Sequence, residues 1–407
     1  MAERLRPESP EQLLETVRWA AGEETPIEVI GAGSKRAIGR PATATHELEL
    51  TGLTGIGLYE PNELVLGAAA GTLLSEIEAA LTAENQLLAF EPPDLGPLLG
   101  GKEGAQTIGG IVACNLSGPR RIKAGAARDH FLGLKAVSGR GEAFKAGGRV
   151  VKNVTGYDLC KLLAGSYGTL AVMSEVTLKV LPAPAKTRTV LVFGLADADA
   201  VKAMTAGLTS AHEISGAAHL PQPAAETSKV DYVAKAAGAV TAVRVEGPQA
   251  SVEHRCAALR RMLGEFGETE ELHGHNSANL WAEIGNVSAF SGEQDRLIWR
   301  LSVPPSEGPV VVAAVMDKIA GQALYDWGGG LVWLAIEPRE DSGAPAIRAA
   351  IAKSGGHATL IRAPRDVRAA TEVFQPQEPG AAGLTKRLKE SFDPRRILNP
   401  GRMYEGV

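Results

Sequence analysis

Apolar positions in the first 180 residues change spacing several times. Helical spacing occurs at Leu13 to Ala21 and again after Thr72, which is a suitable N-cap for the second helix. Alternating apolar and polar residues predict strands at 27–30, from His46, from Asn62, at 131–138, at 142–144 and at 170–180. The mixture predicts an α+β unit.

The pattern of apolar positions changes after Pro182 and Pro184. From residue 185 onward the pattern reads strand, helix, strand, strand, helix, strand, and the same order recurs from residue 297. Two such units in tandem are typical of ferredoxin-like folds. We therefore expect an α+β protein divided at 1–184, 185–370 and 371–407.

Glycine-rich loops interrupt the first unit. The stretch "PIEVIGAGSKRAIGR" places Gly31 and Gly33 directly after a strand, but Arg36 occupies the third position of a G-x-G-x-x-G fingerprint. No crossover helix fits before His46, so a Rossmann unit is excluded. An anion-binding loop and an ordinary turn both remain open for this stretch.

A second glycine cluster spans Leu98 to Arg121. Its pair Gly109-Gly110 precedes a small apolar helix predicted at 111–115, which offers another place for a phosphate or flavin edge. A further short helix is predicted at 157–163.

Composition narrows the function classes. The 407 residues carry a net charge of −5, which argues against nucleic acid as a partner, and no apolar run is long enough to span a bilayer. The three cysteines form no zinc or iron–sulfur pattern. We expect a cytoplasmic protein.

Several motifs together resemble the FAD-binding subunits of bacterial glycolate oxidases, within the vanillyl-alcohol oxidase type of flavoproteins. The most specific are "KNVTGYDLCKLLAGSYGTL" at 152–170 and "NPGRM" at 399–403, supported by "GGIVACNLSGPRR" and "WGGGLVWL". The resemblance implies a PCMH-type FAD-binding domain made of two α+β subdomains. It also implies a ferredoxin-like cap domain for the substrate, and a C-terminal segment that returns to the FAD domain.

The resemblance also implies where FAD is held. The expected cofactor-binding residues are Gly31, Ala32, Gly33, Ser34, Lys35, Arg36, Pro92, Thr107, Ile108, Gly109, Gly110, Ala113, Gly118, Asn153, Gly156, Tyr157, Asp158, Gly168, Thr169, Val172 and Asn399. Because the loop from Gly31 to Gly39 contains neither His nor Cys, we expect non-covalent FAD.

Oxidation of a 2-hydroxy acid requires a carboxylate clamp and a base. Arg300 and Arg362 are candidate clamps, with Arg402 as a third arginine in a similar setting, because a guanidinium matches a carboxylate in shape. His357 is the candidate base. A metal is not expected, since His357 lacks a preceding Glu and the pair His273 and His275 has no carboxylate at ligand spacing.

The implied assembly contains a homologous catalytic flavoprotein subunit, this chain and an iron–sulfur subunit, which would bring it to the inner membrane only peripherally. Two alternatives remain open from the sequence. One is a self-sufficient FAD-dependent alcohol or hydroxy-acid oxidase, and the other is a subunit that holds FAD without catalysing a reaction.

Overall fold

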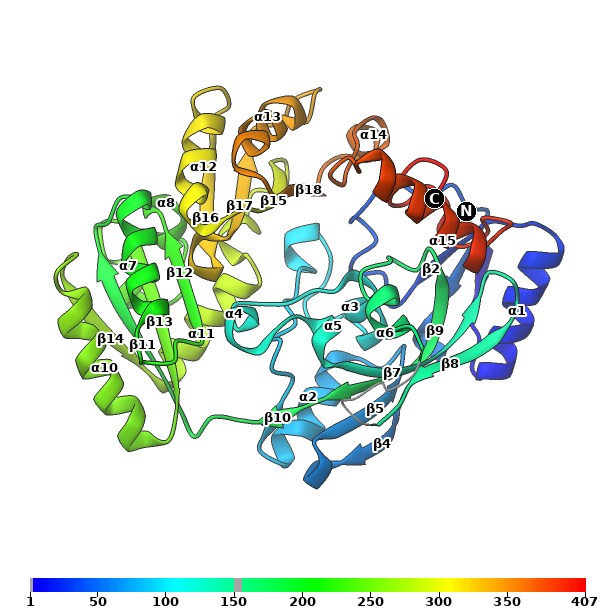
Figure 1. The fold of residues 1–407 in the computed structure, drawn as a ribbon, viewed down its shortest axis with the longest axis horizontal. Coiled ribbons are helices and arrows are strands. Elements are labelled where there is room, and N and C mark those ends of the chain that lie inside the picture. The colour runs from blue at the N-terminus through cyan, green and yellow to red at the C-terminus, as the bar shows by residue number, and fades with distance from the viewer. Residues whose placement is uncertain (1–2, 150–155) are drawn as a thin grey trace.

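The computed structural model describes residues 3–149 and 156–407. Two bodies are visible in Figure 1, an N-terminal unit (3–149 and 156–182) and a sheet unit (186–362). Residues 365–407 run back from the sheet unit to the N-terminal unit. The predicted α+β class is confirmed, whereas the boundary at 184–185 stays a prediction.

The N-terminal unit contains two main sheets. A three-stranded parallel sheet has the order β1-β3-β2, and a five-stranded antiparallel sheet has the order β4-β5-β9-β7-β8. The strands are β1 (Glu3–Leu5), β2 (Ile27–Ile30), β3 (His46–Glu49), β4 (Ile56–Glu60), β5 (Val65–Ala69), β7 (Phe131–Ser138), β8 (Ala143–Gly147) and β9 (Ala171–Lys179). A short pair, β6 (Gln86–Leu87) with β10 (Leu181–Pro182), lies apart.

The helices of this unit are α1 (Pro10–Gly22), α2 (Leu74–Ala83), α3 (Ile108–Cys114), α4 (Arg121–Ala124), α5 (Ala127–His130) and α6 (Leu159–Leu163). Helix α1 is capped by the Ser9 side chain, begins with Pro10 and buries Leu13 and Val17. Strands β2 and β3 pair in parallel although residues 31–45 between them form no helix. This connection is the glycine loop, as the sequence predicted.

The sheet unit is one eight-stranded sheet with the order β14-β11-β13-β12-β16-β17-β15-β18. Its strands are β11 (Lys186–Phe193), β12 (Gly216–Leu220), β13 (Val240–Gly247), β14 (Thr269–His273), β15 (Leu297–Ser302), β16 (Gly321–Asp326), β17 (Leu331–Ile336) and β18 (His357–Arg362). The order is that of two ferredoxin-like units joined edge to edge where β12 meets β16, at His219 and Tyr325.

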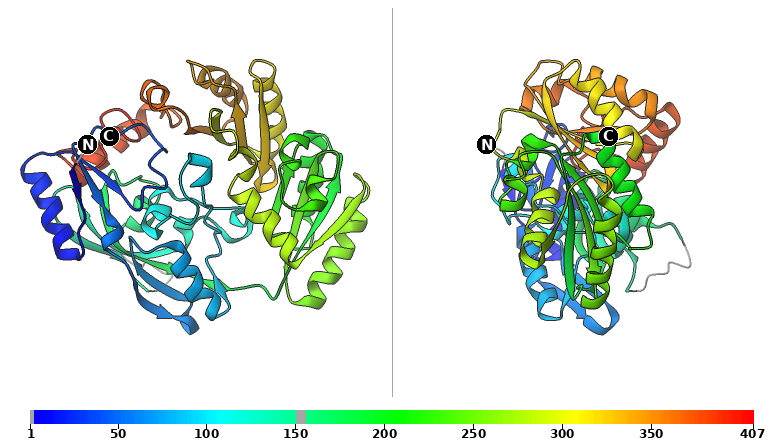
Figure 2. Two further views of the ribbon diagram at one scale, coloured as in Figure 1. Left: turned by 180° about the vertical axis from the view of Figure 1, so that it is seen from behind. Right: turned by 90° about the vertical axis from the view of Figure 1, so that its left-hand side faces the viewer.

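Helices cover one face of this sheet. The helices α7 (Asp197–Thr209), α10 (Gln249–Leu263), α12 (Gly308–Met316) and α13 (Ala344–Ser354) pack there. The short helices α8 (Gln222–Ala225) and α9 (Asp231–Ala234) pack on the opposite face. The other face meets α11 (Gly274–Gly285) and buried side chains of the N-terminal unit, among them Ile38, Leu98 and Leu116. Strand β17 is therefore apolar at every position. Figure 2 shows the sheet and its helices from behind.

The C-terminal segment carries α14 (Arg365–Ala370) and α15 (Pro379–Phe392). Beyond α15 the chain bridges to β2, where the Ile27 N–H donates to the Ile397 carbonyl at 2.8 Å. Within residues 3–149 and 156–407, no helix combines the length and apolar character needed to cross a membrane.

Three local predictions are wrong. The Thr72 hydroxyl does not cap α2; it accepts from the Gly55 N–H at 2.9 Å instead. Helix α3 begins at Ile108, so the pair Gly109-Gly110 forms its first turn rather than preceding it. Helix α6 begins at Leu159, which leaves Tyr157 outside the helix.

Candidate functional site

A cavity opens in the N-terminal unit beneath the glycine loop. It encloses about 690 Å³ of empty space, part of it open to solvent. Its lining consists of Val29, Ile30, Gly31, Ala32, Gly33, Ser34, Lys35, Arg36, Leu50, Ala70, Thr107, Gly109, Gly110, Ala113, Cys114, Tyr167, Gly168, Ala171, Val172, Met173 and Arg402. We call it the glycine-loop cavity.

The loop presents backbone donors to this cavity. Gly33 adopts φ +78°, a left-handed conformation that reverses the chain. No described residue accepts a hydrogen bond from the N–H groups of Gly33, Ser34 or Lys35. Successive free N–H groups in such a turn form an anion-binding concavity.

Lys35 adds a positive charge at the same place. Its side chain is buried, and its Nζ donates to Gln106 Oε1 at 3.0 Å. Burial lowers the pKa of Lys35, and none of the described carboxylates forms an ion pair with it. A buried ammonium without an anionic partner is unfavourable. The cavity therefore favours an anionic ligand.

Close approach of two segments requires glycine. A Cβ on Gly31 would lie 2.2 Å from Thr107 Oγ1, and one on Gly109 would lie 2.8 Å from the Ala70 carbonyl oxygen. The N–H groups of Ile108 and Gly109 already donate to the carbonyls of Thr72 and Ala70. The second glycine segment thus contributes shape to the cavity, whereas the loop at 31–36 contributes the free donors.

The C-terminal segment holds the loop in place. Arg402 donates to Glu28 Oε1 at 3.3 Å and to the Lys35 carbonyl at 3.2 Å. Asn399 accepts from the Val29 N–H at 2.8 Å and donates to the Tyr167 carbonyl at 2.7 Å. Asn399 therefore joins two walls of the cavity from behind.

Twelve of the predicted cofactor residues line this cavity: Gly31, Ala32, Gly33, Ser34, Lys35, Arg36, Thr107, Gly109, Gly110, Ala113, Gly168 and Val172. Others lie outside it: Pro92, Ile108, Gly118, Gly156, Tyr157, Asp158, Thr169 and Asn399. Asn153 falls outside the described residues.

The residues outside the cavity have other environments. Tyr157 is 92% exposed, and Asp158 caps α6 by accepting from the Lys161 N–H at 3.1 Å. Pro92 lines a separate, larger hollow that encloses about 1530 Å³ of empty space between the N-terminal unit and the sheet unit. The Gly118 carbonyl accepts from Trp327 Nε1 at 3.1 Å. This geometry gives no support to their assignment as cofactor contacts.

Sequence reasoning did not assign two polar groups that line the cavity, Cys114 and Tyr167, and it considered Arg402, which also lines the cavity, only as a substrate clamp. Burial raises the pKa of both the Cys114 thiol and the Tyr167 hydroxyl, so both are neutral at pH 7. Tyr167 directly precedes Gly168 in "GSYG", and that adjacency is the signal that would have found it.

Of the proposed catalytic residues, Arg362 has its guanidinium fully engaged. It donates to the backbone carbonyls of Leu98, Phe290, Glu293 and Arg296. A substrate carboxylate would have to displace these contacts, of which the one to Leu98 joins the two units. The geometry therefore gives Arg362 a structural role and does not support it as a clamp.

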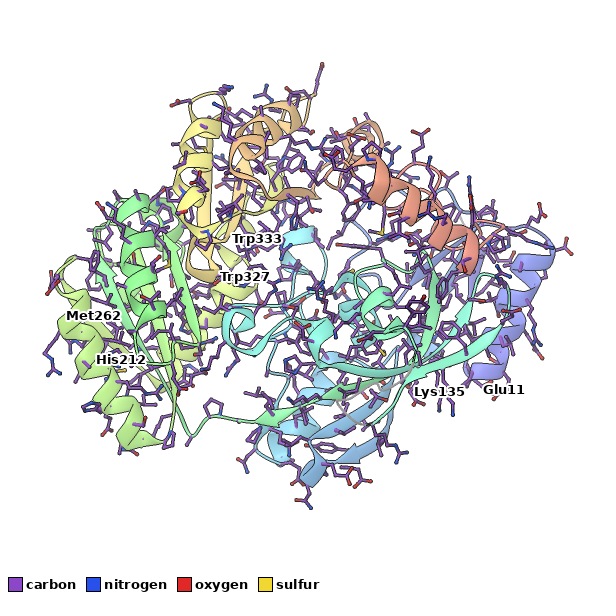
Figure 3. The ribbon with its side chains drawn as sticks, viewed as in Figure 1. Glu11, Lys135, His212, Met262, Trp327 and Trp333 are labelled. Carbon is purple, nitrogen blue, oxygen red and sulfur yellow. The ribbon has the colours of Figure 1, made fainter. Side chains whose placement is uncertain are left out.

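Arg300 and His357 lie near each other on β15 and β18. The Arg300 guanidinium packs on the rings of Trp327, at 5.1 Å, and Trp333, at 5.9 Å. Figure 3 shows both tryptophans where the sheet unit faces the N-terminal unit. Partial desolvation by the surrounding protein, followed by the positive charges of Arg300 and Arg121, lowers the pKa of His357. The lowered pKa favours the neutral form of His357 at pH 7.

The part of the chain that the structure describes contains no group of three or more His, Cys, Asp or Glu side chains arranged to hold a metal ion. His357, which the sequence analysis considered in connection with a metal, is exposed at the start of β18.

Comparison with known proteins places these features in a family. A model of the FAD binding domain matches residues 2–147, and one of the C-terminal domain of FAD linked oxidases matches residues 369–403. The glycolate oxidase subunit GlcE of Escherichia coli is 34% identical over 392 residues, covering 96% of each chain. The glycolate oxidase subunit GlcD of Bacillus subtilis is 28% identical, covering 77% of this chain and 70% of its own.

Solved structures agree on the fold. Substrate-bound p-cresol methylhydroxylase superposes with a TM-score of 0.73 at 12% identity, covering 99% of this chain and 88% of that chain. The glycine-loop cavity fits FAD, because its free N–H groups and Lys35 suit a diphosphate and its apolar wall of Ala113 and Val172 suits a flavin ring. The chain belongs to the FAD-linked oxidase family that contains GlcE, and it is an FAD-dependent oxidoreductase of the kind that acts on CH–OH groups.

Proposed function

We propose that this chain is the FAD-binding subunit of a complex that oxidises glycolate or a similar 2-hydroxy acid to the 2-oxo acid. The names of its relatives in E. coli and B. subtilis, both glycolate oxidase subunits, support the proposal. Three cysteines cannot supply the four thiolates of a typical iron–sulfur cluster, and we propose that a separate iron–sulfur subunit accepts the electrons. A homologous catalytic flavoprotein subunit is the second proposed partner.

Residues of the glycine-loop cavity would hold the cofactor. The N–H groups of Gly33, Ser34 and Lys35, with the Lys35 ammonium, would bind the diphosphate. Val172, Met173 and Ala113 would pack against the ring system. When bound, FAD supplies a hydride acceptor for the α-hydrogen of the substrate.

Two groups of the sheet unit remain candidates for the substrate. Arg300 would bind the carboxylate, because a guanidinium can donate two parallel hydrogen bonds to it. His357, held neutral, would accept the hydroxyl proton. Arg362 is not retained in this proposal, since its donors are engaged with backbone carbonyls.

One observation carries the proposal, namely that free backbone donors and a buried Lys35 meet in one cavity in a chain related to GlcE. The purified chain should bind FAD stoichiometrically, measured by flavin absorbance after removal of free cofactor. Anaerobic titration with glycolate should bleach the flavin only when the partner subunits are present.

Other outcomes separate the alternatives. Bleaching of the isolated chain by glycolate would identify a self-sufficient oxidase. A flavin that stays oxidised even in the assembled complex would identify a subunit that holds FAD without chemistry. A chain that takes up no FAD would overturn the proposal.

A further inference from the structure

Two arginines from different units converge on one aromatic ring. The Arg121 guanidinium lies 4.2 Å from the ring centroid of Trp327, and the Arg300 guanidinium lies 5.1 Å from it. Arg121 begins α4 of the N-terminal unit, and Arg300 lies on β15 of the sheet unit. The ring therefore marks a point where both units place a positive charge.

Trp327 is a fixed platform for these charges. Its Nε1 donates to the Gly118 carbonyl at 3.1 Å, and its backbone N–H donates to Asp326 Oδ1 at 2.7 Å. The side chain is 7% exposed. A guanidinium stacked on a tryptophan face keeps its N–H edge available for a ligand in the plane of the guanidinium.

Neither guanidinium has an anionic partner among the described residues. The carboxylates near enough to act on them electrostatically are Asp129, for Arg121, and Asp326, for Arg300. Both already accept from backbone N–H groups, of Ala126 at 2.9 Å and of Trp327 at 2.7 Å. His357 adds a third basic group to the same neighbourhood.

The position of this cluster relates it to the glycine-loop cavity. Tyr167 lines that cavity and is also close enough to Arg300 to interact with its charge. Arg121 and Arg300 are each only partly buried, so both side chains keep some contact with solvent. The cluster thus lies on the sheet-unit side of the proposed cofactor site.

We infer that Arg121 and Arg300 form a two-guanidinium site for a small carboxylate anion, held on the Trp327 platform. The inference deepens the proposed function and rests on it, because it identifies the residues that would select a 2-hydroxy carboxylate over an uncharged alcohol. Arg121 enters here as a substrate-binding residue that the sequence did not single out. Two fixed guanidiniums would also bind a dicarboxylate more tightly than a monocarboxylate.

Oxalate is a suitable probe, because it carries two carboxylates and has no α-hydrogen to lose. Calorimetric titration of the FAD-loaded full chain at low ionic strength should show oxalate binding more tightly than glycolate, and no binding of ethylene glycol. Arg121→Gln and Arg300→Gln should each weaken oxalate binding by 10-fold or more, on the order expected for a charge-assisted hydrogen bond. Arg300→Lys should recover part of the loss, since it keeps the charge without the planar fork.

Lys123→Gln is the matched control. It removes one positive charge from the same helix, but Lys123 points to solvent and pairs with Glu213 at 3.5 Å. Oxalate affinity unchanged in both arginine variants, or reduced equally in Lys123→Gln, would overturn the inference. Arg121→Gln keeps the test valid if the Arg300 variants fail to fold.

Measuring FAD content distinguishes a failure of the two-guanidinium site from a failure of the proposed function. FAD content is measured on every variant, and Arg121→Gln should retain it. A wild-type chain that holds FAD but binds no oxalate would refute the two-guanidinium site and leave the FAD assignment standing. A chain that holds no FAD would refute the proposed function, and oxalate titration of the cofactor-free chain would still decide whether the anion site exists.

Discussion

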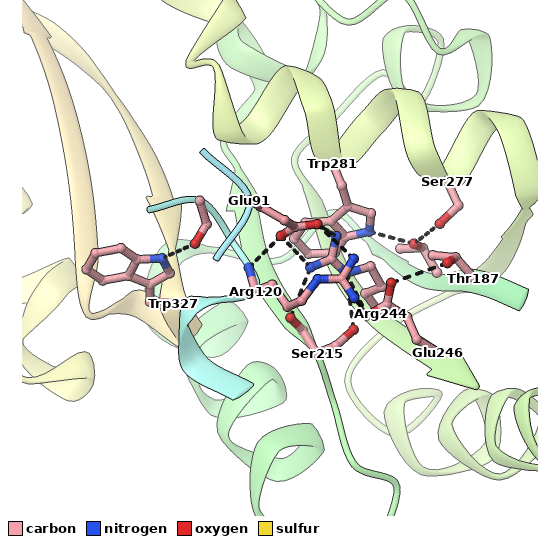
Figure 4. A network of polar contacts seen from close by, with 11 residues as sticks. Glu91, Arg120, Thr187, Ser215, Arg244, Glu246, Ser277, Trp281 and Trp327 are labelled. Atoms are coloured by element: carbon pink, nitrogen blue, oxygen red, sulfur yellow. Dashed lines mark hydrogen bonds and ion pairs between the residues drawn. The ribbon is translucent and has the colours of Figure 1, made fainter. Parts of the chain in front are cut away.

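Arg244 and Glu91 form a two-pronged ion pair that joins the sheet unit to the N-terminal unit. Nη1 and Nη2 of Arg244 each donate to a different carboxylate oxygen of Glu91, both at 2.8 Å. Arg244 also packs on Trp281 at 4.6 Å, and Arg120 links Glu91 to Glu246 (Figure 4). Burial alone would raise the pKa of Glu91, but the two arginines outweigh it and lower that pKa.

Removing Glu91 should destabilise the protein strongly. Glu91→Gln leaves the Arg244 charge, which is 2% exposed, without its hydrogen-bonded carboxylate, and we expect a loss of about 3 kcal/mol in the free energy of unfolding. Denaturant unfolding measures the change. The control Glu175→Gln breaks the exposed pair with Lys135 and should cost less than about 1 kcal/mol. Equal losses of unfolding free energy in the two variants would show that the buried Arg244–Glu91 pair stabilises the protein no more than an exposed pair does.

Gly31→Ala should abolish or greatly weaken FAD binding. The new Cβ would lie 2.2 Å from Thr107 Oγ1, so the loop must move away from the second glycine segment. We expect FAD affinity to fall at least about tenfold, equivalent to ~1.4 kcal/mol, as measured by fluorescence titration. Gly22→Ala is the control, because a Cβ there meets nothing within 4 Å. Normal FAD binding by Gly31→Ala would place the cofactor elsewhere.

Lys35→Met should have opposite effects on the empty and the loaded protein. The buried ammonium has no carboxylate partner, so its removal should raise the melting temperature of the cofactor-free chain. FAD affinity should fall by about 10- to 100-fold, because a charge-assisted contact to the diphosphate is lost. Lys102→Met, at an exposed position, should change neither quantity. If Lys35→Met leaves FAD affinity intact, Lys35 does not contact the cofactor.

Asp326 should make stability fall as pH rises. Burial raises its pKa from 3.8 to about 7. Between about pH 4 and 7 the unfolded chain therefore loses this proton while the folded chain keeps it, and unfolding is favoured. Relative to Asp326→Asn, the wild-type chain should lose up to about 4 kcal/mol over this window, at ~1.4 kcal/mol per pKa unit.

Denaturant unfolding of both proteins at pH 5 and pH 7.5 measures this difference. Asp199→Asn, at an exposed site on α7, is the control and shows how the removal of a surface carboxylate changes the pH dependence of stability. A wild-type minus Asp326→Asn difference that is the same at both pH values would contradict the assignment.

FAD should leave the protein on acid precipitation. Cys114 is the one cysteine of the chain that lines the glycine-loop cavity, and burial raises the pKa of its thiol, which disfavours the nucleophilic thiolate. A colourless pellet and a yellow supernatant are expected for the wild type and for Cys114→Ala. A pellet that stays yellow in the wild type but not in Cys114→Ala would show a covalent bond to Cys114.

Much of the fold could be predicted because its signals are local. Strand β2 has the predicted bounds 27–30 and β7 the predicted bounds 131–138, since alternation and flanking glycines define both. The repeated strand and helix order likewise predicted two ferredoxin-like units. That they share one sheet was not predictable from pattern alone, because the seam between β12 and β16 is a long-range pairing.

Errors arose where distant residues decide the local structure. Thr72 has the right chemistry for a cap, yet its hydroxyl is taken by Gly55, 17 positions earlier. Arg362 has the right residue type for a clamp, but it meets carbonyls up to 264 positions away. Arg121 was overlooked for the same reason, since only the folded chain brings it to Trp327.

The bond network of Asn399 and Arg402 bears on the order of synthesis. Asn399 binds Val29 on β2, and Arg402 binds the Lys35 carbonyl of the glycine loop. Both segments leave the ribosome more than 350 positions earlier. The nascent chain therefore carries an incomplete flavin pocket throughout translation of the sheet unit. We therefore expect FAD to be captured only after the sheet unit has been translated, and a chain truncated before Asn399 to hold FAD less tightly.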